Sequence, residues 1–304
     1  MIENILQRLE NIDRRIIYLF VLFSVSIPIY YKLIFTPAPL PTSEAFYQTV
    51  ERMAEKKDKI ALISSDWGPN TKAENQSQME VAIEHLMRTE VPFVITSMYA
   101  LSTPFLDSVP RKIADRLNKE GTLDRKIEYG KDWVNVGYRV GGSLMIQTLA
   151  KSKNIRDYWS VDATGTPLEV LEAVKDVKDI EDIGLLLEFT GLTGAFDAWV
   201  QFFTADGYTP DFVHGCTSIT IPEARTYVSS GQLDGLHEGL AGAAHYEKLL
   251  SDSYPTRVPG DGWTMNTGLA FAQVIIIFFI FLGNLAPLYR FLARTISTEN
   301  GGIS

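Results

Sequence analysis

Two strongly apolar runs, residues 16–35 and 269–288, flank a long polar middle segment, and this arrangement limits what the chain can form. Twenty helical residues extend about 30 Å, the thickness of the hydrocarbon core of a bilayer. Both runs lie near the chain ends and have basic flanks, which favours membrane spans over buried core helices. We therefore predict transmembrane helices at 16–35 and 267–289. No small-residue cleavage site follows the first run, so we expect it to be retained.

Lysine and arginine residues near the spans predict the orientation. Five lie on the terminal side of the two runs and four on the side of the middle segment; the five are Arg8, Arg14, Arg15, Arg290 and Arg294. Positive charge is enriched on the cytoplasmic side of membrane proteins. We expect a two-span protein of the cell membrane with both termini cytoplasmic, including the tail 290–304, and an extracytoplasmic middle domain.

The first fifteen residues carry an apolar stripe. Ile2, Ile5, Leu9 and Ile12 recur at spacings of three and four, which is typical of an amphipathic helix. Two interpretations remain open. The helix 1–15 either lies in the bilayer interface or packs between subunits, and in the second case these residues and the membrane helices mediate self-association.

Charge and composition exclude several classes of protein. Residues outside 36–266 carry six Lys/Arg and four Asp/Glu, so the net charge of −9 leaves −11 on the middle segment. An acidic domain repels phosphate backbones, and we therefore expect no nucleic-acid partner. Aromatic residues make up 11% of the chain, which excludes disorder. The single cysteine, Cys216, requires a fold without an intrachain disulfide.

The segment 59–252 alternates strand-like and helix-like patterns. Apolar strand-like runs lie at 59–65, 91–97, 133–136, 183–189, 212–216 and 233–236, and most are followed by an amphipathic helical pattern. Such alternation predicts an α/β domain with a Rossmann-like doubly wound, mainly parallel sheet. Residues 36–58 are predicted to be a linker with a lead-in helix, 155–182 a less regular excursion, and 253–266 a second linker.

Ligands of open parallel sheets bind at the carboxyl ends of the strands. A candidate crevice for a small molecule therefore consists of the polar and glycine residues at these strand ends: Ser65, Asp66, Ser97, Gly141, Gly142, Glu188, Thr190, His214, Cys216 and Thr217. The same residue types also occur in ordinary turn-forming loops, so the pattern alone does not separate a binding site from loop chemistry.

Other site chemistries have weaker support. His214 and Cys216 lie two residues apart on one strand, as a base and a thiol nucleophile would, but no third orienting group is identifiable. Metal ligands at characteristic spacings are not present in the sequence. The glycine loops match no nucleotide-binding motif. We predict no metal and no cofactor.

These features favour a membrane-anchored homo-oligomeric assembly or scaffold protein with an extracytoplasmic Rossmann-like domain. The alternative is a membrane-tethered receptor that binds a small solute in the strand-end crevice. A hydrolase built on His214 and Cys216 is the third hypothesis. The sequence leaves open whether the protein is an enzyme, and the missing catalytic motifs favour one that is not.

Overall fold

The computed structural model describes residues 12–192 and 194–300. The chain divides into two compact units, one formed by Thr36–Trp263 and the other by Met1–Phe35 with Thr264–Ser304. The predicted helix 1–15 lies almost entirely outside the described residues.

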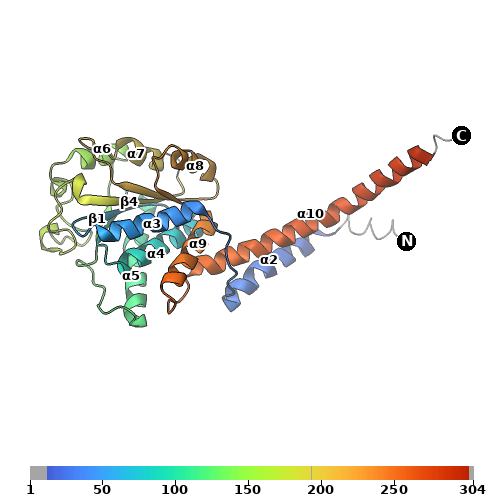
Figure 1. Cartoon of the computed structure of the whole chain (residues 1–304), viewed down its shortest axis with the longest axis horizontal. Coiled ribbons are helices and arrows are strands. Elements are labelled where there is room, and N and C mark those ends of the chain that lie inside the picture. The colour runs from blue at the N-terminus through green and yellow to red at the C-terminus, as the bar shows by residue number, and fades with distance from the viewer. Residues whose placement is uncertain (1–11, 193, 301–304) are drawn as a thin grey trace. The chain divides into compact units, whose positions relative to one another are not determined.

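The Thr36–Trp263 unit, here called the sheet domain, is built on six strands (Figure 1). They are β1 (Ile60–Asp66), β2 (Phe93–Ser97), β3 (Trp133–Tyr138), β4 (Ile183–Thr190), β5 (Asp211–Cys216) and β6 (Gly235–Glu238). Every neighbouring pair is parallel, and the strand order is β3-β2-β1-β4-β5-β6. This confirms the predicted α/β fold with a parallel sheet. The order is that of dinucleotide-binding doubly wound domains.

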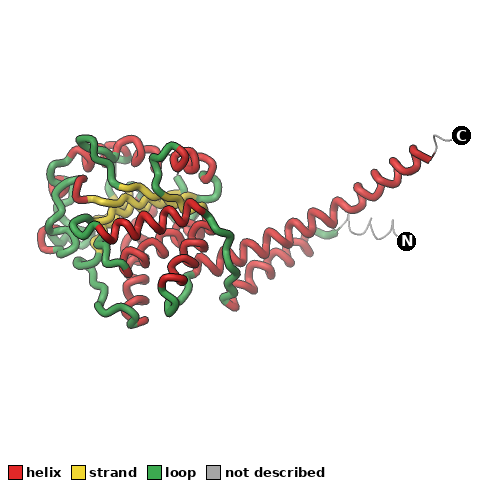
Figure 2. The backbone as a smooth tube through the Cα atoms, in the orientation of Figure 1, coloured by secondary structure: helices red, strands yellow, loops and turns green. Residues whose placement is uncertain are grey.

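Helices cover both faces of the sheet (Figure 2). One face packs against α3 (Pro41–Glu55), α4 (Lys72–Arg88), α5 (Thr103–Glu120) and α9 (Gly239–Ser253). The other packs against α6 (Ser143–Lys151), α7 (Ala195–Phe202) and α8 (Ile221–Ser229). The excursion between α6 and β4 contains three short 3-10 turns, Ile155–Asp157, Leu168–Val170 and Ile180–Asp182, and a fourth, Ala100–Ser102, precedes α5.

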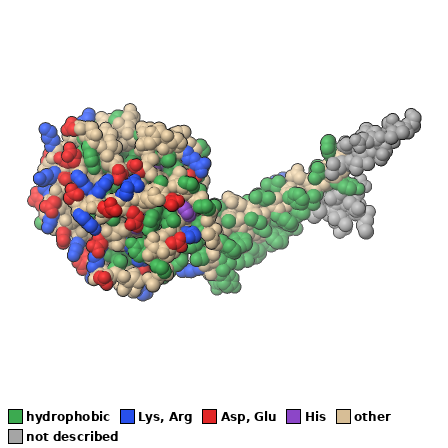
Figure 3. All heavy atoms as spheres, in the orientation of Figure 1, with side chains coloured by type: hydrophobic (Ala, Val, Ile, Leu, Met, Phe, Trp, Pro, Cys, Tyr) green, Lys and Arg blue, Asp and Glu red, His purple; other side chains and the backbone are tan. Residues whose placement is uncertain are grey.

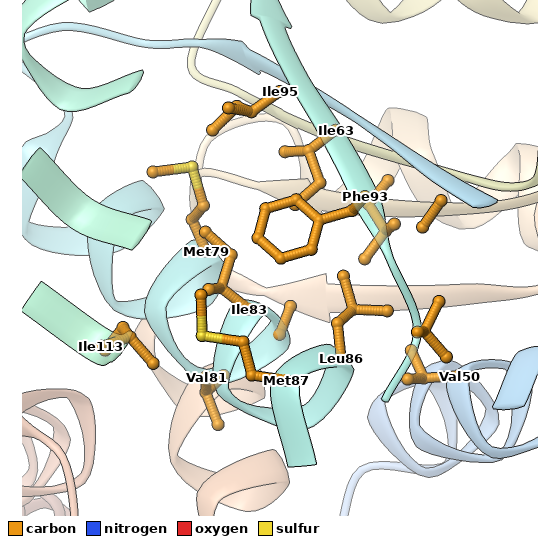
Figure 4. Packing of buried hydrophobic residues seen from close by; sticks show 14 of the residues in the cluster. Val50, Ile63, Met79, Val81, Ile83, Leu86, Met87, Phe93, Ile95 and Ile113 are labelled. Atoms are coloured by element: carbon orange, nitrogen blue, oxygen red, sulfur yellow. The ribbon is translucent and has the colours of Figure 1, made fainter. Parts of the chain in front are cut away.

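Strand periodicity divides the core into two layers. On β1, Ile63 points toward α4 whereas Leu62 points toward the α6–α8 side, because successive strand residues face opposite sides. In the α4 layer, Ile63 and Phe93 pack against Ile83 and Leu86 (Figure 4). Both sheet faces are therefore dry, which explains why the strands are nearly continuous apolar runs.

A buried carboxylate, that of Glu84, joins α4, α5 and the segment after α9. Arg257 donates two hydrogen bonds to it, at 2.9 and 2.8 Å, and Arg88 and Arg116 donate at 2.9 and 2.5 Å. Burial raises the pKa of Glu84, but the three guanidinium groups outweigh it and hold this pKa below its ordinary value. Glu247 accepts from the backbone N–H of Gly260 at 2.6 Å, which fixes the chain just before α10 (Asp261–Asn300).

The second unit contains α2 (Arg14–Tyr31) and most of α10. Phe20 contacts Phe279 and Phe35 contacts Phe271, so the two helices run antiparallel. Gly268 lies where a Cβ would be only 3.4 Å from the Val25 carbonyl oxygen, so this glycine allows close approach of the two backbones. Both α2 and residues Asp261–Phe291 of α10 are long and apolar enough to span a membrane.

We expect Arg257→Met to destabilise the sheet domain by about 3 kcal/mol, because it removes two charge-assisted bonds from a buried carboxylate. Lys248→Met is the matched control, since Lys248 pairs with Asp252 at the surface and its loss should cost less than about 1 kcal/mol. Denaturant titration of both full-length variants in detergent, followed by tryptophan fluorescence, measures the difference. Equal stability of the two variants would contradict the role given to the Glu84 cluster.

Candidate functional site

The strand order places the switch point between β1 and β4, where the crevice of a doubly wound domain forms. Asp66 and Thr190 are the last residues of these two strands and are register partners, and the Thr190 hydroxyl donates to the Asp66 carbonyl oxygen at 2.8 Å. Glu188 on β4 and His214 on β5 are also register partners. The structure therefore brings four of the predicted site residues to one place.

Asp66 is fully buried and holds the loop after β2. Its carboxylate accepts from the Ser97 hydroxyl at 3.0 Å, from the Met98 backbone N–H at 2.7 Å and from the Ser64 hydroxyl at 2.5 Å. Burial nevertheless raises the pKa of Asp66. The carboxylate is satisfied by its own chain, so its contacts are those of a structural residue.

Two side-chain amides from α4 fill the α4 side of the switch point. Asn75 donates to the carbonyl oxygens of Thr190 and Gly215, both at 3.2 Å. Gln78 donates to the carbonyl of Cys216 at 2.7 Å and also to those of His237 and Gly239. These amides satisfy strand-end carbonyls that would otherwise face a ligand or water.

The start of α4 carries an acidic contact. Glu74, in the first turn, accepts from the backbone N–H and the hydroxyl of Ser218, at 2.7 and 2.9 Å. In nucleotide-binding domains this position receives a phosphate. A carboxylate here repels phosphate, so the local charge opposes anion binding.

The α7–α8 side of the switch point holds a buried pair, Glu188 and His214. Nδ1 of His214 lies 2.5 Å from Glu188 Oε2 and 3.0 Å from the Glu188 carbonyl oxygen. Only the carbonyl contact has hydrogen-bond geometry, so the carboxyl group of Glu188 lies against the imidazole ring without a hydrogen bond to it. Burial raises the pKa of Glu188 to about 7, although His214 opposes this shift. Phe196 of α7 stacks on the imidazole at 4.3 Å and shields it.

His214 lines a small pocket of about 10 Å³ at the carboxyl edge, together with Thr190, Leu192, Gly194, Phe196, Asp197, Thr220, Glu223 and Ala224. The lining contains two carboxylates besides the buried pair and no lysine or arginine, which favours a cationic group over an anion. This volume is about what one water molecule needs, and it lies far below the usual range of ligand sites, about 300–1,000 Å³.

A larger hollow, of about 380 Å³, lies elsewhere. Its lining includes Asp211 and Phe212 at the start of β5 and Asp234 before β6, which places it at the amino ends of these strands. Function in this fold resides at the opposite edge, so we assign the candidate site to the smaller pocket beside His214.

Cys216 does not have the surroundings of a catalytic thiol. It packs with Ala224 and Leu236, and its thiol donates to the His237 carbonyl oxygen at 3.6 Å. Burial raises the pKa of the thiol to about 12, so it remains protonated at neutral pH. The neighbouring Thr217 is buried and its hydroxyl lies 3.5 Å from that of Thr220.

The remaining predicted residues lie apart from the Glu188–His214 pair. Ser65 points to the other sheet face, where its hydroxyl lies 3.0 Å from that of Ser102. Gly141 and Gly142 have φ of +122° and +53° and form the turn between β3, an edge strand, and α6. The described residues contain no cluster of three His, Cys, Asp or Glu able to hold a metal ion.

Sequence reasoning missed Asn75, Gln78, Phe196 and Asp197. Asn75 and Gln78 are fully buried polar residues three positions apart on α4, and this spacing puts both side chains on the face that meets the strand ends. Asn75 and Gln78 could have been found in the sequence as polar residues on the otherwise apolar face of a predicted helix.

No family model, curated protein or solved structure matches this chain.

The raised pKa of Glu188 has a measurable consequence. In the folded state Glu188 holds a proton that the unfolded chain releases above its ordinary pKa of 4.5, so its stabilising contribution is complete below pH 4.5 and is lost as the pH rises through about 7. The Glu188→Gln side chain stays neutral at every pH. As the pH rises, we therefore expect the free energy of unfolding of this variant to fall by about 3 kcal/mol less than that of the wild type, at about 1.4 kcal/mol per pKa unit.

Denaturant titrations at pH 5 and pH 8 on the wild type and the variant measure this effect. Glu55→Gln, at an exposed position of α3, is the control and should keep the wild-type pH dependence. Parallel pH profiles for Glu188→Gln and the wild type would show that Glu188 is already ionised at neutral pH.

Proposed function

We propose that this chain is a membrane-anchored homo-oligomeric scaffold protein whose acidic Rossmann-like domain stands outside the cytoplasm. The observation that carries the proposal is the exposed apolar surface of α2 and α10. Exposing an apolar surface of this length to water is unfavourable, so lipid or neighbouring subunits would cover it.

The exposure is extensive on both helices. Of the α2 residues only Pro28 is buried. Leu22 is 60% exposed, and Ile277 and Phe281 of α10 are 65% and 60% exposed. Figure 3 shows apolar side chains covering the visible face of the pair. A buried core helix would be covered on most sides, so this exposure supports the membrane-spanning interpretation.

The antiparallel pairing supports the proposed orientation. The Phe20–Phe279 contact places Arg14 and Arg15, at the start of α2, at the same end of the pair as Arg290. The opposite end carries Lys32. Positive charge concentrates on the cytoplasmic side, so the arginine-rich end belongs in the cytoplasm.

The geometry of the sheet domain favours a binding or assembly role over catalysis. Asn75 and Gln78 occupy one side of the switch point, and Cys216, the one thiol of the chain, is buried and protonated. Self-association is supported by the stripe Ile2, Ile5, Leu9 and Ile12, which would add an apolar subunit contact next to the first span.

A second candidate function is a tethered receptor for a small solute. The small pocket beside His214 supports it, because the lining residues Asp197 and Glu223 provide negative charge for a cationic group. A receptor needs no subunit contact, so the particle mass of the solubilised protein separates the two candidates.

The orientation is tested with single cysteines in intact cells. We expect Ser229→Cys, at an exposed position of α8, to react with an impermeant maleimide, and Ser304→Cys to react only after permeabilisation. The buried Cys216 should contribute little background. The reverse labelling pattern would place the sheet domain in the cytoplasm.

Assembly is tested by replacing the apolar stripe. We expect Ile5→Ser combined with Leu9→Ser to yield a smaller detergent-solubilised particle by light scattering, because each subunit loses about 1.5–3 kcal/mol per buried aliphatic side chain. Circular dichroism should show an intact sheet domain. The matched control, Gln7→Ser with Asn11→Ser, alters polar positions of the same segment and should keep the wild-type mass. An unchanged mass in the apolar double variant, or a monomeric wild type, would favour the receptor.

A further inference from the structure

The apolar run of α10, residues 269–288, contains only two polar side chains, those of Gln273 and Asn284. Both are exposed. They are eleven positions apart in the chain, which is about three helical turns, so they lie on one face of the helix. Ile277 and Ile280 lie between them on the same face and are 65% and 59% exposed. We call Gln273, Ile277, Ile280 and Asn284 the amide face of α10.

The amide face is turned away from α2. Gly268 and Phe279 both lie against α2, and Ala272, which lies between them on the same side of α10, is buried. At about 100° per residue, Ile277 and Asn284 lie about 160° and 140° around the helix from Phe279. The first helix of the chain therefore covers the other side of α10 and leaves the amide face open.

In a membrane-spanning α10 both amides lie deep in the hydrocarbon. At about 1.5 Å per residue, Gln273 and Asn284 are each about 8 Å from the middle of the apolar run, whereas the hydrocarbon extends about 15 Å to either side. Lipid cannot hydrogen-bond to an amide, so polar groups at this depth face another helix. The Asn284 amide donates to the Ile280 carbonyl oxygen of its own helix at 2.7 Å. This bond leaves the amide oxygen and a second hydrogen for a partner outside the helix.

The chemistry of the amide face fits a second copy of the same face. Two copies inserted with one topology hold their α10 helices parallel, and in a symmetric pair each residue of the face meets its own counterpart. A carboxamide both donates and accepts, so Asn284 can bond to the same residue of the second copy, and so can Gln273. The spacings of four, three and four along the face are those by which two helices pack at a crossing angle of about 20°.

We propose that two copies of this chain pair through the amide faces of α10, with Gln273 and Asn284 hydrogen-bonded across the interface inside the bilayer. This inference rests on the proposed membrane anchoring and self-association, and it names the helix face by which the copies meet. The contact needs only the helix pair and is independent of the sheet domain.

The first test is oxidative cross-linking of the full-length chain in membranes, with one engineered cysteine at a time. We expect Ile277→Cys and Ile280→Cys to give disulfide-linked dimers on a non-reducing gel, because facing positions of a close helix pair come within the Cα separation of about 4.4–6.8 Å that a disulfide needs. Phe278→Cys is the matched control and should remain monomeric, since Phe278 is 52% exposed but lies on another side of the helix. The native Cys216 is buried and common to all three variants.

The second test removes an amide without harming the span. Leucine is close to asparagine in size and more apolar, so Asn284→Leu should insert as well as the wild type. We expect it to weaken association by about tenfold, the scale of an interhelical amide bond, measured by energy transfer between labelled copies diluted in lipid vesicles. Asn284→Gln keeps the amide and is the control, with an association constant within about twofold of the wild type.

Carbonate extraction of the membranes separates failure of this inference from failure of the proposed function. Release of the chain by carbonate would overturn the anchoring together with the inference. A wild type that resists carbonate but is monomeric would overturn self-association and the inference and leave the anchoring intact. Dimers that do not cross-link at Ile277→Cys or Ile280→Cys and are unaffected by Asn284→Leu would overturn the inference alone and assign the contact to another surface, such as the stripe that contains Ile5 and Leu9. Equal cross-linking at Phe278→Cys would mean random collision and would also overturn it.

Discussion

The buried carboxylate of Glu84 makes the interactions on which the packing of the last segment of the sheet domain depends. It lies on α4 in the middle of the sheet domain, yet its strongest partner, Arg257, belongs to the segment that leads into α10. A charge this deeply buried is tolerated only because three guanidinium groups surround it. The course of the segment around Arg257 is therefore fixed by α4, the helix that also closes one side of the switch point.

The two sides of the switch point differ because different helices cover them. On the α4 side, Asn75 and Gln78 bond to strand-end carbonyls and leave the crevice filled. On the α7–α8 side, burial of Glu188 against His214 leaves an acidic group beside a small pocket. A doubly wound domain that retained nucleotide binding would need the α4 side open. The candidate site of this domain therefore lies on the α7–α8 side.

The sequence predicts the fold far better than the site. Strands such as β4 (Ile183–Thr190) are nearly continuous apolar runs because both sheet faces are covered, and that pattern is visible without coordinates. Spacing also brings Glu188, Thr190 and His214 to one edge. The face on which each strand-end residue points depends on register, so Ser65 lies on the opposite side. The sequence does not show the partners of Asn75 and Gln78, because these are backbone carbonyls of three distant strands.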